Sequence, residues 1–147
     1  MKKTLFGILS LLLSSAVFSQ NHHIKFKVNG VQANDELIVA SYLYDSHKII
    51  DTVVVDANGY GELKGSGKLD AGIHIVLLPS HYYVEMVIPH DDQEFYFEFD
   101  TSLNISAQAF KGSLDNEAFL KYNQYTQEKG DEIKDVVKQL RDTTISK

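Results

Sequence analysis

The chain has 147 residues, no cysteine and a formal net charge of −6 at pH 7. The acidic balance argues against a nucleic-acid partner, which requires a cationic surface, and against electrostatic docking to anionic lipid. The lack of cysteine excludes disulfide bonds and thiol chemistry within this chain. The length predicts one ordinary domain with its own hydrophobic core.

Residues 1–19 have the pattern of a secretory signal peptide. Lys2 and Lys3 precede an apolar stretch from Thr4 to Phe18, which predicts cleavage before Gln20. A membrane-spanning helix needs about 20 apolar residues, and serines interrupt this stretch, so we expect cleavage instead of a retained anchor. The mature chain then has 12 basic and 20 acidic residues, a net charge of −8. We expect an exported protein of the periplasm or cell envelope with no transmembrane span after cleavage.

The next ninety residues carry strand patterns separated by turn residues. Alternation is clearest where Phe95, Phe97 and Phe99 interleave with polar or amphipathic residues, and Asn58-Gly59 is a strong hairpin signal. The expected strands cover residues 24–29, 37–44, 48–55, 60–64, 73–78, 82–88, 94–99 and 107–111. Seven to eight short strands at this spacing predict a mainly β fold, an antiparallel β-sandwich or a partly open barrel, over residues 20–111.

Residues 112–147 change to a helical period. Ser113 is a plausible N-cap residue, and acidic residues follow it in the first turn. Gly130 separates two apolar sets, so the segment is either a kinked helix or two helices with a break at residues 129–131. The second set is Ile133, Val136, Val137 and Leu140. Such a sparse stripe needs a partner surface, so we expect this helical segment to lead into a further domain.

Candidate catalytic and metal-binding residues do not form a recognisable site in the sequence. His22-His23 and His90-Asp91-Asp92 do not match a metal-ligand spacing, and we interpret them as solvated residues. Glu94 and Glu98 lie on one strand face about 13 Å apart at a rise of ~3.3 Å per residue, too far for a glycosidase pair. We therefore predict no catalytic residue, no cofactor-binding residue and no metal ligand, and no enzyme activity for this chain.

Aromatic side chains are the remaining candidates for a ligand surface. Tyr82 and Tyr83, together with Tyr42 and Tyr44, are candidates for a stacking platform, for example for a sugar. Core packing is the alternative use of these rings. Glu85 stands among apolar neighbours, and we expect it at the surface. We name Tyr82 and Tyr83 as the candidate ligand surface.

Three stretches in a fixed order resemble a known family. The first is Ile24–Gly30 leading to Leu37–Tyr42, then Ile50-Asp51-Thr52 and the turn Asp56-Ala57-Asn58-Gly59. The second is Leu69–Pro79, and the third is Phe110–Tyr122 with its Gly112-Ser113…Asn116…Phe119…Tyr122 pattern. Together they resemble the N-terminal β-rich domain of unknown function that precedes the thioredoxin domain in envelope thiol-disulfide oxidoreductases of Bacteroidota. The resemblance implies a β-rich domain followed by helices that lead into a thioredoxin fold. It carries over no catalytic residue, because the active cysteines of that family lie in the part that this chain lacks.

Two functional expectations follow. The first is a non-catalytic accessory domain of an exported thioredoxin-like protein, which positions that protein or recognises its partner. The alternative is a stand-alone exported binding module for a glycan or an envelope protein. The expected partner is a thioredoxin-like domain or an envelope protein, and homo-oligomerisation remains open because exposed strand edges can pair with a second chain.

Overall fold

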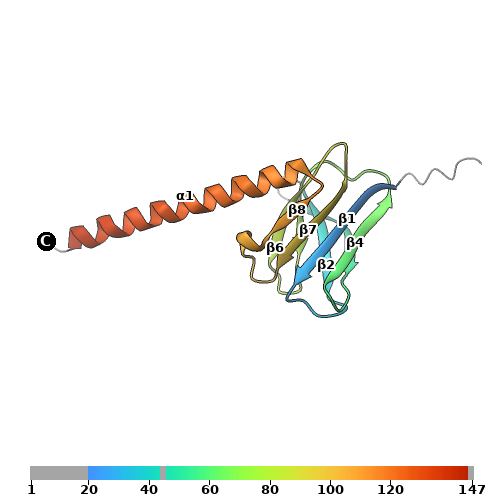
Figure 1. Ribbon diagram of the computed structural model, residues 1–147, viewed down its shortest axis with the longest axis horizontal. Coiled ribbons are helices and arrows are strands. Elements are labelled where there is room, and N and C mark those ends of the chain that lie inside the picture. Colours follow the sequence, from blue (N-terminus) through green and yellow to red (C-terminus); the bar gives the residue numbers. More distant parts are fainter. Residues whose placement is uncertain (1–19, 44–45, 146–147) are drawn as a thin grey trace, which may run out of the picture.

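A computed structural model describes residues 20–43 and 46–145 of this chain (Figure 1). The predicted signal peptide and Tyr44 lie outside the described residues. The chain forms two four-stranded sheets that face each other, and one long helix leaves the sandwich at its end (Figure 1). In chain order the elements are β1 (Gln20–Asn29), β2 (Glu36–Leu43), β3 (Ser46–Val54), β4 (Tyr60–Ser66), β5 (Gly72–Leu77), β6 (Tyr83–Ile88), β7 (Glu94–Asp100), the 3-10 helix η1 (Ile105–Ala107), β8 (Ala109–Lys111) and α1 (Leu114–Ile145).

The two sheets have the orders β4-β1-β7-β8 and β3-β2-β5-β6. All neighbouring strands are antiparallel except β1 and β7, which run parallel from His23–Glu94 to Asn29–Asp100. The sheets do not close into a barrel, so the predicted mainly β fold is confirmed as a sandwich. The parallel pair differs from the expected all-antiparallel arrangement because β7 returns beside β1 after the chain has built the second sheet.

The core lies between the two sheets, where the inward residues of each strand meet. Phe95, Phe97 and Phe99 are buried while Glu94 and Glu98 face outward, as the alternation predicts. The β7 phenylalanines pack with those of neighbouring strands, and the Phe97 and Phe110 rings stack with centroids 4.0 Å apart. The opposite layer supplies mainly aliphatic residues: Leu37, Val39, Val53, Val76, Val84, Met86 and Ile88.

Helix α1 begins against the sandwich and then projects away from it (Figure 1). Its first turns contact β6, β8 and η1, and Leu120 packs on the core. Of the two expected alternatives, two helices with a break at residues 129–131 is wrong, because one helix runs through Gly130. Ion pairs from Lys129 to Glu132 and from Lys134 to Asp131 span this region at 2.7 and 2.9 Å and help to offset the helix-breaking tendency of glycine.

Beyond Gly130 the helix is exposed on all sides. Every residue from Asp131 to Arg141 is exposed, and the predicted apolar stripe remains at the surface, with Val136 54% exposed. Within the described part of the chain, no helix has the length and apolar character needed to cross a membrane.

Candidate ligand groove

The predicted ligand surface lies at the β5–β6 hairpin. His81 takes a positive φ of 65° in this hairpin. Two backbone hydrogen bonds close the turn: His81 N donates to the Leu78 carbonyl, and Leu78 N donates to the Tyr82 carbonyl. Tyr82 and Tyr83 follow at once and are 62% and 51% exposed. Neither ring belongs to the core, so the alternative reading of these two tyrosines as core residues is wrong.

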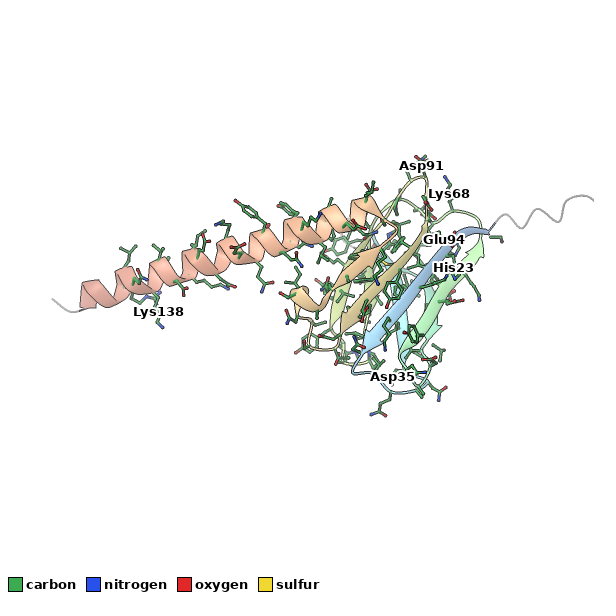
Figure 2. The ribbon with its side chains drawn as sticks, in the orientation of Figure 1. His23, Asp35, Lys68, Asp91, Glu94 and Lys138 are labelled. Carbon is green, nitrogen blue, oxygen red and sulfur yellow. The ribbon has the colours of Figure 1, made fainter. Side chains whose placement is uncertain are left out.

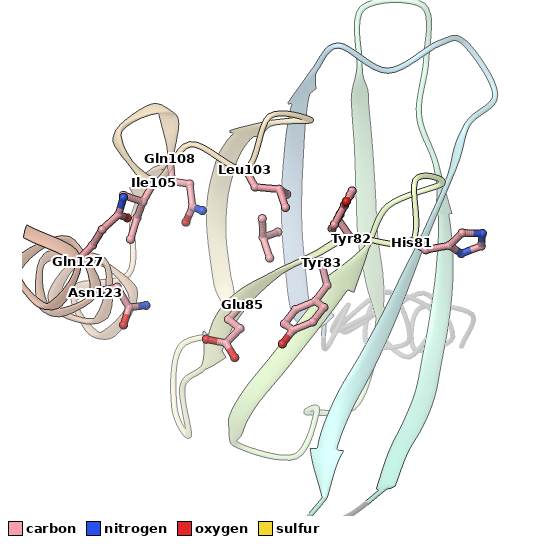
Figure 3. A pocket seen from close by; sticks show the side chains of 10 residues that line it. His81, Tyr82, Tyr83, Glu85, Leu103, Ile105, Gln108, Asn123 and Gln127 are labelled. Carbon is pink, nitrogen blue, oxygen red and sulfur yellow. The ribbon is translucent and has the colours of Figure 1, made fainter. Parts of the chain in front are cut away.

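Tyr82 and Tyr83 line one wall of a groove of about 500 Å³ (Figure 3). The same wall carries Glu85, which is half-buried on β6. The facing wall comes from residues far along the chain, from the η1 region and from α1. The residues of that wall are Leu103, Ile105, Gln108, Asn123 and Gln127. The groove therefore forms only when α1 docks beside β6.

The facing wall is built mainly from side-chain amides. In the described part of the chain, the amide groups of Gln108, Asn123 and Gln127 have no hydrogen-bond partner, whereas the neighbouring Gln124 donates to the Ile105 carbonyl at 3.4 Å. Glu85 supplies the carboxylate of the groove. Free amides, one carboxylate and two exposed rings can donate, accept and stack, which are the contacts of a binding site.

Asn116 at the start of α1 is the residue that sequence reasoning missed. Its side chain is 0% exposed, and it pairs with the backbone of β6 as a strand would. Asn116 Oδ1 accepts from Val87 N at 2.7 Å, and Asn116 Nδ2 donates to the Val87 carbonyl at 2.7 Å and to Ser113 Oγ at 2.9 Å. Its signal in the sequence is the spacing of Ser113 and Asn116 at the helix start. Asn116 therefore closes one end of the β6 edge and fixes α1 beside the groove.

Tyr42, the other described tyrosine of the expected platform, does not line the groove. Tyr42 is half-exposed on β2 and contacts the His47 ring edge-to-face at 4.8 Å.

The histidine and aspartate motifs gather at one end of the sandwich (Figure 2). His22, His23, Asp91 and Asp92 line a small depression of about 170 Å³ with Lys68. His90 Nδ1 lies 2.8 Å from Asp91 Oδ1, and this contact, followed by the charge of Lys68, lowers the pKa of the Asp91 carboxyl. In the part of the chain that the structure describes, no three histidine or acidic side chains are placed to hold a metal ion.

His74 is a buried titratable group of the core. It is 1% exposed on β5, and its Nδ1 lies 3.1 Å from the Gly72 carbonyl. Its Nε2 has no hydrogen-bond partner among the residues that the structure describes. The carbonyl requires a proton on Nδ1, so a second proton on Nε2 would be a buried, unpaired charge. Burial accordingly lowers the pKa of His74 below its usual value, against the smaller opposing effects of the Gly72 carbonyl and Asp70.

No protein-family model matches this chain, and no curated protein or solved structure matches it either. The geometry therefore carries the functional argument. The groove offers hydrogen bonds and ring contacts, which suit the binding of a ligand.

Proposed function

We propose that this chain is a non-catalytic accessory domain of an exported thioredoxin-like thiol-disulfide oxidoreductase of the periplasm or cell envelope. Its role is to position that protein or to recognise its partner. The chain has no cysteine, so the redox centre belongs to a thioredoxin domain that follows or accompanies it. The stretches that resemble the family fall on β1 to β3 with the turn after β3, on β5, and on β8 with the entry into α1.

The observation that carries the proposal is the apolar face of α1 beyond the sandwich. Ile133, Val136 and Val137 share one side of the helix and are 64%, 54% and 48% exposed. The two ion pairs of this segment contribute only about 0.3–0.5 kcal/mol each. A helix supported so weakly is marginal in water and is stabilised by packing on another surface. A neighbouring thioredoxin domain is the surface that we propose.

A site-specific crosslink tests this proposal. A photo-crosslinking amino acid replaces Val136 in the native polypeptide within its own cells, and Lys138, which is exposed elsewhere on the same segment, is the matched control position. We expect the Val136 probe, and not the Lys138 probe, to crosslink to a segment that contains a Cys-x-x-Cys dithiol. Crosslinks that never reach a dithiol protein would contradict the proposal.

The second candidate function is a stand-alone exported binding module for a glycan or an envelope protein. The exposure of Tyr82 and Tyr83 at the mouth of a groove favours it. A glycan array and a pull-down from an envelope fraction, each repeated with Tyr82→Ala and Tyr83→Ala, test this function. Binding that is unchanged by both substitutions removes this surface from consideration.

A further inference from the structure

The groove contains an open sheet edge. Among the described residues, β6 is the last strand of its sheet, with β5 as its one neighbouring strand. Antiparallel partners alternate between hydrogen-bonded and non-bonded pairs. The bond from Leu78 N to the Tyr82 carbonyl at 2.8 Å sets this alternation, so the backbone groups of Val84, Met86 and Ile88 point toward β5. The backbone groups of the intervening residues point away from β5, toward the groove and α1.

The outward backbone groups differ along the edge. Those of Val87 are bonded to the Asn116 side chain. Those of Tyr83 and Glu85 have no hydrogen-bond partner within the described residues, and both residues line the groove. The edge thus presents two N–H donors and two carbonyl acceptors, with about 6.7 Å between equivalent groups because alternate residues of a strand are that far apart. This spacing matches the backbone of an extended polypeptide.

The side chains around the edge narrow the class of ligand. Glu85 is the acidic group of the groove, and a residue placed directly opposite it on an added strand interacts with it most favourably when it is Lys or Arg. Gln108, Asn123 and Gln127 lie across the groove from the edge (Figure 3). Their side-chain amides have no hydrogen-bond partner among the described residues and can bond the far side of the added strand. The volume of about 500 Å³ lies within the ~300–1,000 Å³ that is usual for ligand sites.

We infer that the groove between β6 and α1 binds an extended polypeptide segment, which adds to the sheet as a strand beside β6 with a Lys or Arg opposite Glu85. This mode of recognition is strand addition, in which backbone bonds give affinity and alternate side chains give specificity. A glycan lacks the repeating donor and acceptor pair that the edge matches. The inference rests on the sheet edge and on the side chains of the groove, so it goes beyond the proposed redox context and holds or fails independently of it.

The test uses the full chain and three mixtures of synthetic heptapeptides that are random at the flanking positions. The first mixture has Lys fixed at the centre, and the second has Glu there. The third has Lys at the centre and a proline two residues away on each side. Those two positions turn the same backbone edge toward β6 as the central residue does, and a proline there has no N–H to donate and puts its ring against the edge. Amide hydrogen exchange followed by NMR reports the protection of individual residues. We expect the Lys mixture to slow exchange of the Tyr83 and Glu85 amides by at least tenfold, the Glu mixture to bind about threefold more weakly, and the proline mixture to leave both amides unchanged.

Two variants and one control substitution test the same inference. Glu85→Lys reverses the preference, so the Glu mixture then binds better than the Lys mixture. Asn123→Tyr fills the groove and abolishes protection, whereas Thr126→Tyr on the exposed side of α1 does not. Protection that appears elsewhere in the chain, a glycan that shields the same amides when no peptide does, or exchange slowed by dimerisation alone would each overturn the inference.

Discussion

Replacing Asn116 with leucine tests how α1 is held against the sheet. Asn116 is fully buried and serves three polar partners, the Val87 N–H, the Val87 carbonyl and the Ser113 hydroxyl. Leucine has a similar volume but cannot bond any of them. The substitution therefore leaves two backbone groups of β6 buried without a partner.

The size of the effect follows from these two groups. Each unsatisfied buried backbone group costs about 1–3 kcal/mol, while burial of the leucine side chain returns about 1.5–3 kcal/mol at most. At the middle of these ranges the expected net loss is about 2 kcal/mol, a large share of the ~5–15 kcal/mol that stabilises an ordinary domain. With a urea m-value of about 1–3 kcal/mol/M, the unfolding midpoint falls by about 1–2 M.

The assay is urea unfolding followed by tyrosine fluorescence and circular dichroism. Asn123→Leu is the matched control, because it makes the same change on the same helix at a half-buried amide that has no hydrogen bond. We expect the control to shift stability by less than about 0.5 kcal/mol. The reasoning is refuted if Asn116→Leu and Asn123→Leu unfold at the same urea concentration.

Three further outcomes follow from individual side chains. Because the pKa of folded His74 lies below 6.5, the unfolded chain binds a proton there more readily than the folded chain as the pH falls. The contribution of His74 to the free energy of unfolding is therefore full above pH 6.5 and declines below it, by up to about 1.4 kcal/mol per pH unit. Urea unfolding between pH 7 and 5 should show that His74→Phe lacks this decline. Gly59→Ala puts a Cβ against the Val28 carbonyl oxygen at a φ of 77°, so the free energy of unfolding measured with urea should fall by at least about 2 kcal/mol. Gly67→Ala meets no neighbouring atom and should lower it by only about 1 kcal/mol. Burial, aided by the hydrogen bond that the Tyr96 hydroxyl donates to Glu98, raises the pKa of Tyr96 to about 12. Tyr96 is therefore expected to ionise last, and an alkaline absorbance titration of Tyr96→Phe should lack this final step. A titration curve that the substitution leaves unchanged would contradict this.

Local patterns predict the strands well because burial on one face leaves a period of two. The three phenylalanines of β7 lie where that period puts them, and the Asn58-Gly59 turn joins β3 to β4 with Gly59 at positive φ. The parallel pairing of β1 with β7 was not predicted. It depends on contacts between residues more than seventy positions apart, which no local period encodes.

The helix and the groove show the same limit. Gly130 suggested a break, but a glycine costs only about 1 kcal/mol in a helix, and the flanking ion pairs favour continuity. Tyr82 and Tyr83 could be named as a candidate ligand surface because they are aromatic, but the sequence alone left core packing as the alternative. Asn116 could not be placed, because its partner Val87 lies 29 residues away along the chain.

The most direct test of the central proposal is to count thiols in the native polypeptide. An antibody against the sandwich isolates that polypeptide from the cell envelope, and its mass is measured before and after reduction and alkylation. The proposal predicts a polypeptide larger than this chain that gains two alkyl groups only after reduction, as a redox-active dithiol would. A polypeptide that gains none and has the mass of this chain, or of this chain without residues 1–19, would contradict it.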